Sequence, residues 1–280
     1  MQTEIKAPAI RYHGGKFRLA KWITGFFPPH RCYVEPYGGA ASVLLRKPRS
    51  HAEVYNDLDG EIVNLFRVLR DPLDNHRLRT LCALTPYSRD EFNLAYEPTE
   101  NRIEKARRLV VRATMGFGSA AATADNKTGF RSDTKREYST AQQIWASYPD
   151  NLAAIGERLI SVLIENRPAL QVINDHDSEK TLHYIDPPYL PQTRHRWRRT
   201  GYAYRFEMTE QEHIELLEPV GKVKGMVIIS GYDSELYNDI LTGWRKETKI
   251  AQVSAGTGGT SKRTECLWIS PNCKEQERAA

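Results

Sequence analysis

The segment TLHYIDPPYLPQT, residues 181–193, places an acid, two prolines and a tyrosine directly after an apolar run. Pro187 and Pro188 end a β-strand, because proline has no N–H to give to a sheet and fixes its own φ. Asp186 and Tyr189 are therefore held beside each other on a stiff turn. A carboxylate next to an aromatic face can bind an exocyclic amine and stack on its ring. The alternative is a strand end followed by a core tyrosine.

The amine of adenine or cytosine is a weak nucleophile, because its lone pair is delocalised into the ring. Hydrogen bonds from the amine to the Asp186 carboxylate and to the Pro187 carbonyl favour a tetrahedral nitrogen, which can attack an activated methyl group directly. A base must leave the stacked duplex to reach such a turn. We therefore predict a catalytic site for a flipped-out base, formed by Asp186, Pro187, Pro188 and Tyr189.

Two further apolar runs also end near acids. Glu35 ends the run of residues 31–35, within YVEPYGGA (residues 33–40), and Asp57 lies in EVYNDLD (residues 53–59). Ligands of open α/β sheets bind beyond the carboxyl ends of the strands. We therefore expect Glu35, Asp57 and Asp186 to line one edge of the sheet together.

The turn after the first of these runs contains a glycine pair. Gly38 and Gly39 permit a tight turn and close approach of a ligand, before a helix that we expect to begin at Ala40. Asp57, about twenty residues further on, has the position of an acid that binds the ribose of a nucleoside cofactor. A simple helix cap is the alternative for Asp57.

The same turn does not suit a nicotinamide cofactor. It lacks GxGxxG, and Pro36 with the bulky Tyr37 occupies the space where a pyrophosphate needs close approach of the backbone. A nucleoside cofactor without phosphates fits better, and we predict S-adenosylmethionine. Its carboxylate needs a cation, which Lys16 in RYHGGKFRLAKW (residues 11–22) can supply. A solvated surface lysine is the alternative.

The elements that position these residues alternate between strand and helix. Helix starts are marked by Asp59, by a Thr209–Glu212 capping box and by Asp233. Such alternation predicts an α/β fold with a Rossmann-like, mostly parallel sheet and helices on both faces. The β-favouring runs cover residues 31–35, 52–57, 160–165, 182–186, 225–231 and 265–270.

Strand signals stop between about residues 70 and 150. This stretch contains the helix-like IEKARRLVVRA (residues 103–113) and the polar MGFGSAAATADNKTG (residues 115–129). We interpret it as a smaller, mainly helical insert between the second and third strands. Residues 1–69 and 151–280 then form the catalytic, cofactor-binding domain.

Six motifs occur in the order found in one known family: RYHGGK, YVEPYGGAASVLL, YNDLDGEIVNLF, YIDPPY, FEMTEQEHIELL and RTECLWIS. In this order they resemble the Dam-like DNA adenine-N6 methyltransferases. The resemblance implies a seven-stranded methyltransferase sheet, a target-recognition role for the insert, and Asp186 to Tyr189 around the target amine. It differs at Tyr12-His13, where the family often has Trp-Ala, and at Tyr37, where it often has Phe. The cofactor-binding residues it implies are Tyr12, Lys16, Glu35, Pro36, Tyr37, Gly38, Asp57 and Asp186.

Basic segments with aromatic residues supply candidate contacts to DNA. TRHRWRRTGYAYRF (residues 193–206) follows the predicted catalytic turn, and the insert carries further cations. Arg107, Arg108 and Arg112 could instead form the solvated side of an amphipathic helix. The predicted DNA-binding residues are Arg112, Lys127, Arg131, Lys135, Arg136, Arg194, Arg196, Trp197, Arg198 and Arg199.

Composition limits the remaining classes. The net charge of +5 permits an anionic partner, here double-stranded DNA. No apolar run approaches the ~18 residues of a membrane helix and the first residues lack a signal-peptide pattern, so we expect a cytoplasmic protein without membrane contact. The histidines and cysteines have no ligand-like spacing, and we predict no metal site. A monomer and a homodimer both fit the sequence.

These observations predict a site-specific methyltransferase that moves a methyl group from S-adenosylmethionine to N6 of a flipped adenine in double-stranded DNA. Cytosine-N4 methylation is an alternative, since both amines suit the same carboxylate and aromatic ring. A catalytically inactive DNA-binding protein of the same fold is an alternative from another class. The presence of Lys16, Asp57 and Asp186 argues against it.

Overall fold

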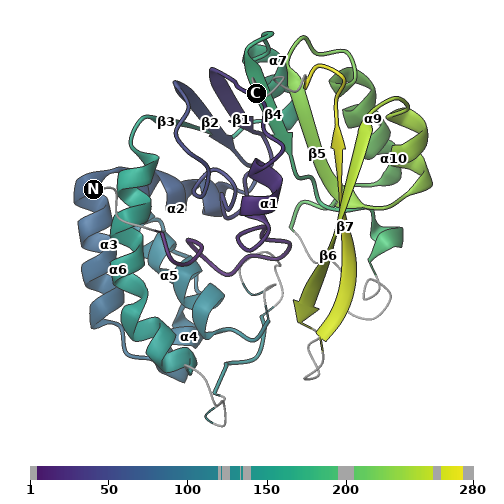
Figure 1. Ribbon diagram of the computed structural model, residues 1–280. Coiled ribbons are helices and arrows are strands. Elements are labelled where there is room, and N and C mark those ends of the chain that lie inside the picture. Colours follow the sequence, from purple (N-terminus) through teal and green to yellow (C-terminus); the bar gives the residue numbers. More distant parts are fainter. Residues whose placement is uncertain are drawn as a thin grey trace, which may run out of the picture.

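The computed structural model describes residues 5–118, 121, 127–132, 134, 140–194, 205–254 and 260–273. Its centre is a seven-stranded sheet with the order β3-β2-β1-β4-β5-β7-β6 (Figure 1). The first five strands in this order are parallel, and β7 runs antiparallel to both β5 and β6. The strands are β1 Cys32–Glu35, β2 Ala52–Asn56, β3 Val162–Glu165, β4 Thr181–Ile185, β5 Met226–Tyr232, β6 Arg245–Ser254 and β7 Thr260–Ile269.

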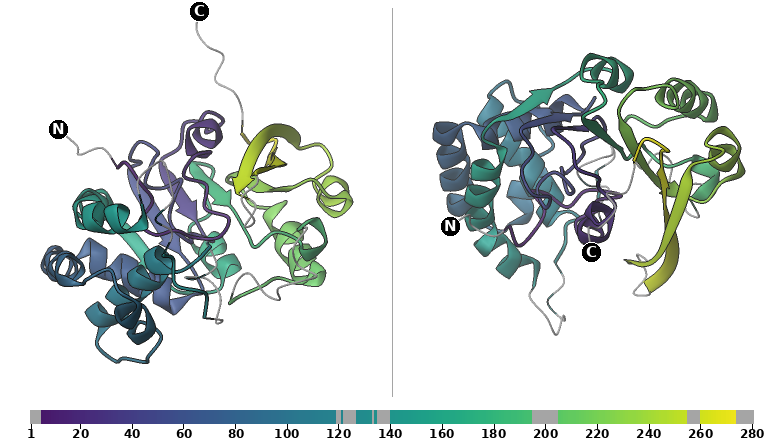
Figure 2. Two further views of the ribbon diagram at one scale, coloured as in Figure 1. Left: turned by 90° about the horizontal axis from the view of Figure 1, so that it is seen from below. Right: turned by 45° about the horizontal axis from the view of Figure 1, so that its top comes forward.

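Helices cover both faces of the sheet (Figure 1, Figure 2). Residues of α1, α2, α3, α5 and α6 share one core cluster with the sheet, and residues of α7, α9 and α10 share another. None of the described helices has the length and apolar character to cross a membrane. The helices are α1 Ala20–Thr24, α2 Gly60–Arg70, α3 Pro72–Leu84, α4 Arg89–Leu94, α5 Arg102–Met115, α6 Ala141–Leu159, α7 Ala169–Asp175, α9 Glu210–Val220 and α10 Glu235–Ile240, with the short 3-10 helix η2 Pro191–Thr193.

Alternation along the central strands explains the two cores. In β5, Ile228 packs in the cluster with α2 and α6, while its neighbours Val227 and Ile229 pack in the cluster with α9 and α10. In β4, Tyr184 packs in the first of these clusters and Ile185 packs in the second. A strand that is covered on both faces reads as a continuous apolar run, which is why these strands are visible in the sequence.

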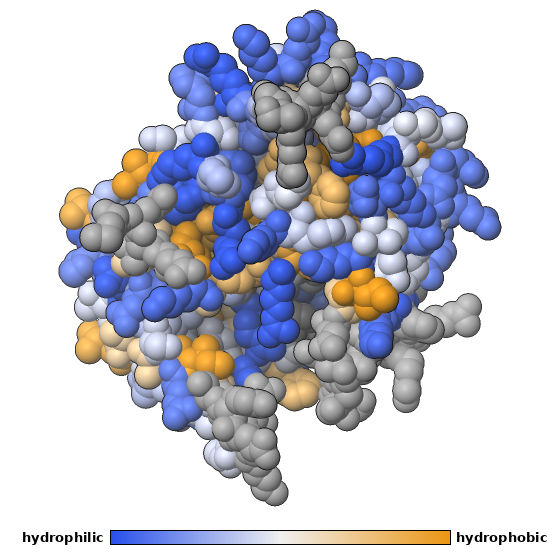
Figure 3. All heavy atoms as spheres, in the orientation of Figure 1, coloured by the Kyte–Doolittle hydropathy of each residue, from blue (hydrophilic) through white to orange (hydrophobic). Residues whose placement is uncertain are grey.

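The outer surface contrasts with these cores. The side shown in Figure 3 carries mostly hydrophilic side chains, with separate small hydrophobic patches between them.

The six predicted strands are all present. β6 was missed, because it is a polar edge strand whose exposed residues give no apolar run.

Two of the three predicted helix starts are confirmed. The Asp59 carboxylate accepts a hydrogen bond from Glu61 N at the start of α2, and Thr209 forms a capping box with Glu212 at the start of α9. The prediction that Asp233 caps the next helix is wrong by one residue. Ser234 is the N-cap of α10. Asp233 instead accepts hydrogen bonds from Asn238 and Lys246.

The helix expected to begin at Ala40 does not form. Residues 39–47 make a series of turns, and Ala41 has a φ of 52°, outside the helical region. Leu44 N donates to Glu35 Oε2 at 2.9 Å, and Leu44 O accepts from Arg158 Nη2 at 2.7 Å. These side chains bind the backbone groups that a helix would pair internally.

The chain between β2 and β3 forms helices α2 to α6, with no strand among its described residues. These helices share the core cluster that reaches the sheet, and α2 contacts both α5 and α6. Helix α6 also runs through residue 150, where the sequence analysis placed a boundary. The helical part is therefore packed as one body with the sheet, and its assignment to target recognition stays a prediction.

A buried ionic cluster ties the turns after β1 to this helical part. Glu53 Oε1 accepts from Lys47 Nζ and Glu53 Oε2 accepts from Arg158 Nη1, each at 2.6 Å. All three side chains are almost completely buried. Removing one partner from such a cluster leaves charges without compensation in a site that excludes water.

We expect Glu53→Ala to lower the free energy of unfolding by about 3–5 kcal/mol, because Lys47 and Arg158 would then be buried without a counter-charge. Urea denaturation followed by circular dichroism measures the change. The matched control is Asp175→Ala, since Asp175 pairs with Arg167 at the surface. Its loss should cost less than about 1 kcal/mol. Equal effects of the two substitutions would contradict the assigned role of Glu53.

Candidate active site

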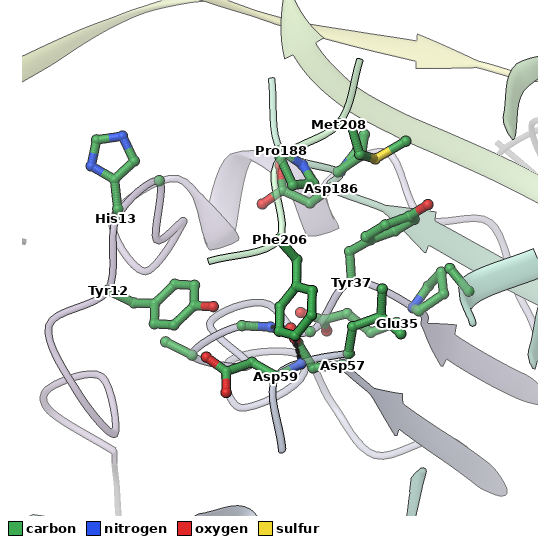
Figure 4. Close-up of a pocket in the computed structure, with 18 of the residues that line it drawn as sticks. Tyr12, His13, Glu35, Tyr37, Asp57, Asp59, Asp186, Pro188, Phe206 and Met208 are labelled. Carbon is green, nitrogen blue, oxygen red and sulfur yellow. Dashed lines mark hydrogen bonds between the residues drawn. The ribbon is translucent and has the colours of Figure 1, made fainter. Parts of the chain in front are cut away.

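A cavity of about 490 Å³ opens at the carboxyl ends of β1, β2 and β4 (Figure 4). Its volume lies within the roughly 300–1,000 Å³ typical of sites for small molecules and cofactors. Glu35, Asp57 and Asp186 all line it. The structure thus brings together the three acids whose strand endings predicted a common edge. The roles given to each acid stay predictions.

Asp186 is fixed at this edge by two neighbours. It follows the last residue of β4, as the proline pair predicted, and its Oδ1 accepts from Ser230 Oγ at 2.6 Å. Lys16 Nζ lies 3.0 Å from each carboxylate oxygen. Pro187 and Pro188 continue along the wall of the cavity. Asp186 is partly accessible, with 18% of its side chain exposed.

Lys16 is buried, so the alternative of a solvated surface lysine is wrong. Its Nζ donates to Gly14 O at 2.7 Å and contacts Asp186, and it lies 4.6 Å from the centroid of the Tyr189 ring. Burial alone would lower the pKa of Lys16. The negative charges of Asp186 and Glu265 raise it by more, so the pKa lies above its ordinary value. The ammonium is therefore a permanent positive charge beside Asp186.

Tyr189 is turned away from the cavity. Its hydroxyl donates to Glu265 Oε2 at 2.7 Å, and its ring meets Tyr232 edge to face with centroids 4.6 Å apart. With Lys16 against it, the ring is largely buried. Its predicted stacking role stays a prediction. Tyr12, Tyr37 and Phe206 are aromatic residues that do line the cavity (Figure 4).

The glycines after β1 allow the backbone to pack against aromatic rings. A Cβ at Gly38 would lie 2.1 Å from Tyr55 Cε2, so no other residue fits there without displacing the ring. Gly39 has a φ of +46°, and a Cβ there would lie 2.8 Å from Tyr12 Cε1. Close packing against these rings therefore requires glycine at both positions, and the close approach of a ligand here stays a prediction.

Asp57 connects the loops that follow β1 and β2. Its Oδ2 accepts from Gly39 N and its Oδ1 accepts from Asp59 N, each at 2.8 Å. The cap of α2 is Asp59, so the alternative that Asp57 is a simple helix cap is wrong. Burial raises the pKa of Asp57 to about 6, although its backbone hydrogen bonds act in the opposite direction.

Glu35 is almost completely buried at the base of the cavity. Its Oε2 accepts from the Tyr33 hydroxyl at 2.8 Å and from Leu44 N at 2.9 Å. Burial raises the pKa of Glu35 to about 8, more than these hydrogen bonds lower it. Glu35 is therefore largely protonated at neutral pH and can donate a hydrogen bond to a ligand.

Comparison with known proteins gives a family for this geometry. The family model of the D12 class N6 adenine-specific DNA methyltransferases matches residues 12–256. The chain belongs to this family. The match confirms the α/β fold and adenine-N6 DNA methylation as the activity, in preference to cytosine-N4 methylation. D12-class enzymes generally take the methyl group from S-adenosylmethionine.

Several bacterial enzymes named DNA adenine methylase are similar to this D12-class chain over most of their length. The enzyme of Haemophilus influenzae is 25% identical over 263 residues, which cover 87% of this chain and 86% of the relative. The enzyme of Serratia marcescens is 23% identical over 257 residues, covering 88% and 89%. That of Escherichia coli K12 is 22% identical over 274 residues, covering 92% of each.

Several cavity residues of the D12-class enzyme were not identified from its sequence. Arg205, Phe206 and Met208 line the cavity, and Arg205 forms ion pairs with Asp59 and Glu61. The motif containing Phe206 and Met208 was recognised without a role for either residue. Residues 168–170, at the start of α7, also line the cavity. They follow β3, whose carboxyl end lies at the same edge of the sheet. Their position after this strand could have identified them in the sequence as cavity residues.

Most described cations that the sequence suggested for DNA binding have partners within the protein. Arg112 Nη2 donates to Glu61 Oε2 and Arg194 Nη2 donates to Glu207 Oε2, each at 2.6 Å. Arg131 is buried, whereas Lys127 is exposed and lies 5.3 Å from the ring centroid of Tyr96. Their contacts with DNA stay predictions. Lys135, Arg136, Arg196, Trp197, Arg198 and Arg199 lie outside the described residues.

Arg107 and Arg108, in the middle of α5, have structural partners. Arg107 is almost completely buried and pairs with Glu104 and Glu91, at 2.7 and 2.8 Å. Arg108 also binds Glu104, and its Nη1 donates to the carbonyl of Glu97. The alternative of a solvated helix face is therefore wrong for Arg107. Among the described residues no three acids, histidines or cysteines gather in a way that could hold a metal ion.

We expect Glu35→Gln to remove a pH dependence of stability. Between pH 4.5 and about 8 the folded enzyme keeps a proton on Glu35 that the unfolded chain has released, so stability falls as the pH rises. The slope approaches about 1.4 kcal/mol per pH unit. Denaturant titrations from pH 5 to 9 should show wild type losing stability relative to Glu35→Gln. Glu218→Gln, on the exposed side of α9, is the control, and a difference that does not vary with pH would contradict the protonated state of Glu35.

Proposed function

We propose that this enzyme methylates N6 of an adenine flipped out of double-stranded DNA by direct displacement, with S-adenosylmethionine in the cavity and Asp186 as the acceptor for the amine. The observation that carries the proposal is the partly accessible Asp186 carboxylate, fixed by Lys16 and Ser230 at a cavity that Glu35 and Asp57 also line. Bacterial DNA as substrate is consistent with action in the cytoplasm.

The cavity suits a sulfonium nucleoside. Tyr12, Tyr37 and Phe206 offer aromatic surface for the adenine and ribose (Figure 4). Each carboxylate oxygen of Asp57 accepts one backbone N–H and keeps a second lone pair, so Asp57 can still accept from ribose hydroxyls. Acids outnumber cations among the lining residues, which favours a ligand with positive groups.

Glu35 is the candidate for the amino-acid end of the cofactor. Its protonated carboxyl can donate to the cofactor carboxylate. Lys16, which the sequence suggested for that carboxylate, is engaged by Asp186 and Gly14 and acts in the proposal on Asp186. S-adenosylmethionine supplies the electrophilic methyl group that the amine attacks.

Asp186 keeps the capacity to bind the target amine. A carboxylate offers about four acceptor sites, and the contacts from Lys16 and Ser230 use three of them. An N–H of adenine N6 can occupy the remaining site, and the carbonyl of Pro187 can accept the second N–H. Bound S-adenosylmethionine would supply the methyl group to this nitrogen, and its sulfur would keep the electron pair of the carbon–sulfur bond. The surplus amine proton then passes to the Asp186 carboxylate.

DNA must deliver the base to this edge. Unstacking one base costs a few kcal/mol, which contacts to the phosphates and the flanking bases have to offset. Lys127 is an exposed cation of the helical part, and the segment at residues 193–206 follows the catalytic turn. We assign the helical part to DNA binding and target recognition, and we assign this segment to DNA binding up to the cavity-lining Arg205 and Phe206.

We expect Asp186→Asn to lower methyl transfer by at least about a hundredfold, because the neutral amide cannot take the amine proton. Cofactor affinity should stay within about threefold. Transfer of labelled methyl groups to unmethylated genomic DNA measures the first quantity, and calorimetric titration measures the second. Asp239→Ala, an exposed change on α10, is the control.

Nucleoside analysis of the DNA product separates the possible outcomes. N6-methyladenine is expected from wild type. Turnover by Asp186→Asn at the wild-type rate would remove Asp186 from its role. A wild-type protein that binds DNA but transfers no methyl group to any tested DNA would favour the inactive DNA-binding alternative.

We expect Asp57→Asn to weaken cofactor binding by about 10–100-fold, the effect of losing one hydrogen bond to a charged group. The same substitution also weakens the bond that holds Gly39 in place. Calorimetric titration with S-adenosylmethionine and its demethylated product measures the affinity. DNA binding by the variant is the control and should be unchanged. Unaltered cofactor affinity would exclude the ribose role.

A further inference from the structure

The motif RTECLWIS resembles the family but has no role in the chemistry above. Residues 263–269 of the motif lie in β7, next to β5, and residues 266–269 are apolar and buried. Glu265 is itself buried, at 7% exposure, directly opposite Tyr232 in the antiparallel register. A buried carboxylate costs several kcal/mol unless it is paired and hydrogen-bonded, so its presence here indicates a specific task.

Glu265 contacts Tyr189, the residue of the predicted catalytic turn whose side chain faces away from the cavity. Its Oε2 accepts the Tyr189 hydroxyl at 2.7 Å. The Tyr189 ring is held on two other sides, by the edge-to-face contact with Tyr232 and by the Lys16 ammonium 4.6 Å from its centroid. The hydrogen bond from the Tyr189 hydroxyl restricts movement of the ring in its own plane. It thereby holds the end of the turn that begins at Asp186.

The same cluster connects Glu265 to the catalytic carboxylate through Lys16. The Lys16 ammonium contacts both the Asp186 carboxylate and the face of the Tyr189 ring, so the ring forms one wall of the site that holds Lys16. Burial raises the pKa of Glu265. The charge of Lys16 and the hydrogen bond from Tyr189 act in the opposite direction but do not cancel this effect. Displacement of Tyr189 would remove the ring from one side of Lys16 and leave Gly14 O and Asp186 as its remaining contacts, so the ammonium and the carboxylate it binds could shift.

We propose that Glu265 is a positioning residue for methyl transfer: by accepting the Tyr189 hydroxyl it fixes the ring and the turn, and so aligns Asp186 with the flipped base. This inference rests on the proposed function of Asp186 to Tyr189. Glu265 contacts neither the cavity nor its ligands, since it is not among the lining residues. Its loss should therefore lower kcat and leave cofactor affinity nearly unchanged.

Four variants test the role: Glu265→Ala, Glu265→Gln, Tyr189→Phe and the double variant Glu265→Ala with Tyr189→Phe. Glu265→Ala and Tyr189→Phe should each lower kcat on unmethylated genomic DNA about tenfold or more, with the dissociation constant for S-adenosylmethionine within about twofold. Glu265→Gln keeps an acceptor oxygen for the Tyr189 hydroxyl and should recover kcat to within about threefold of wild type. The double variant should be no slower than either single variant, because both remove the same bond.

The matched control is Glu247→Gln, which makes the same chemical change on the neighbouring strand, near Arg245 at the surface. It should leave kcat unchanged. Thermal denaturation identifies any variant that fails to fold, and Tyr189→Phe, which removes only one oxygen, keeps the test valid if Glu265→Ala is unstable.

Three results would overturn the inference: wild-type kcat in Tyr189→Phe, a folded Glu265→Gln as slow as Glu265→Ala, or additive losses in the double variant. Absence of methyl transfer by the wild-type enzyme would be a different failure. It would overturn the proposed function itself, and it is visible before any variant is compared.

Discussion

The ion pair between the buried Lys16 and the partly buried Asp186 is the contact on which the site depends. It joins a turn near the start of the chain to the carboxyl end of β4, across 170 residues of sequence. Removing both charges from water is costly, so each needs further partners. Gly14 O and the Tyr189 ring complete the surroundings of Lys16, and Ser230 completes those of Asp186. The turn, the central strand and β5 are therefore fixed relative to one another by one compensated pair of charges.

The cavity beside this pair is acidic, but its acids differ in state. Glu35 has a pKa of about 8 and Asp57 one of about 6, in both cases raised mainly by burial. One cavity thus offers a largely protonated carboxyl at Glu35 and a largely ionised one at Asp57. A ligand with both an acid group and cationic groups can find a suitable partner for each. The two glycines of the first loop allow this arrangement, since side chains there would collide with Tyr55 and Tyr12.

The sequence was informative where one residue type satisfies one local requirement. Strands covered on both faces appeared as apolar runs, acids at their ends marked the edge that binds ligands, and Asp59 was recognisable as a cap. It failed where partners come from distant segments. Glu35 and Arg158 bind the backbone of Leu44 and prevent the helix expected at Ala40. No local pattern shows that Lys16 would bind Asp186 rather than a ligand. Burial produces the apolar signal of the central strands, and the polar edge strand β6 lacks this signal because it is exposed.

The helices of residues 60–159, to which we assign target recognition, share one continuous core with the sheet. Side chains of α2, α5 and α6 belong to the same cluster as residues of β1, β2 and β4. A helical part borrowed from another methyltransferase would bring a mismatched inner surface and unfold the scaffold it was meant to redirect. On that assignment, target choice can diverge most easily in the outward-facing residues and connecting loops, because changes there leave the inner faces of the helices intact.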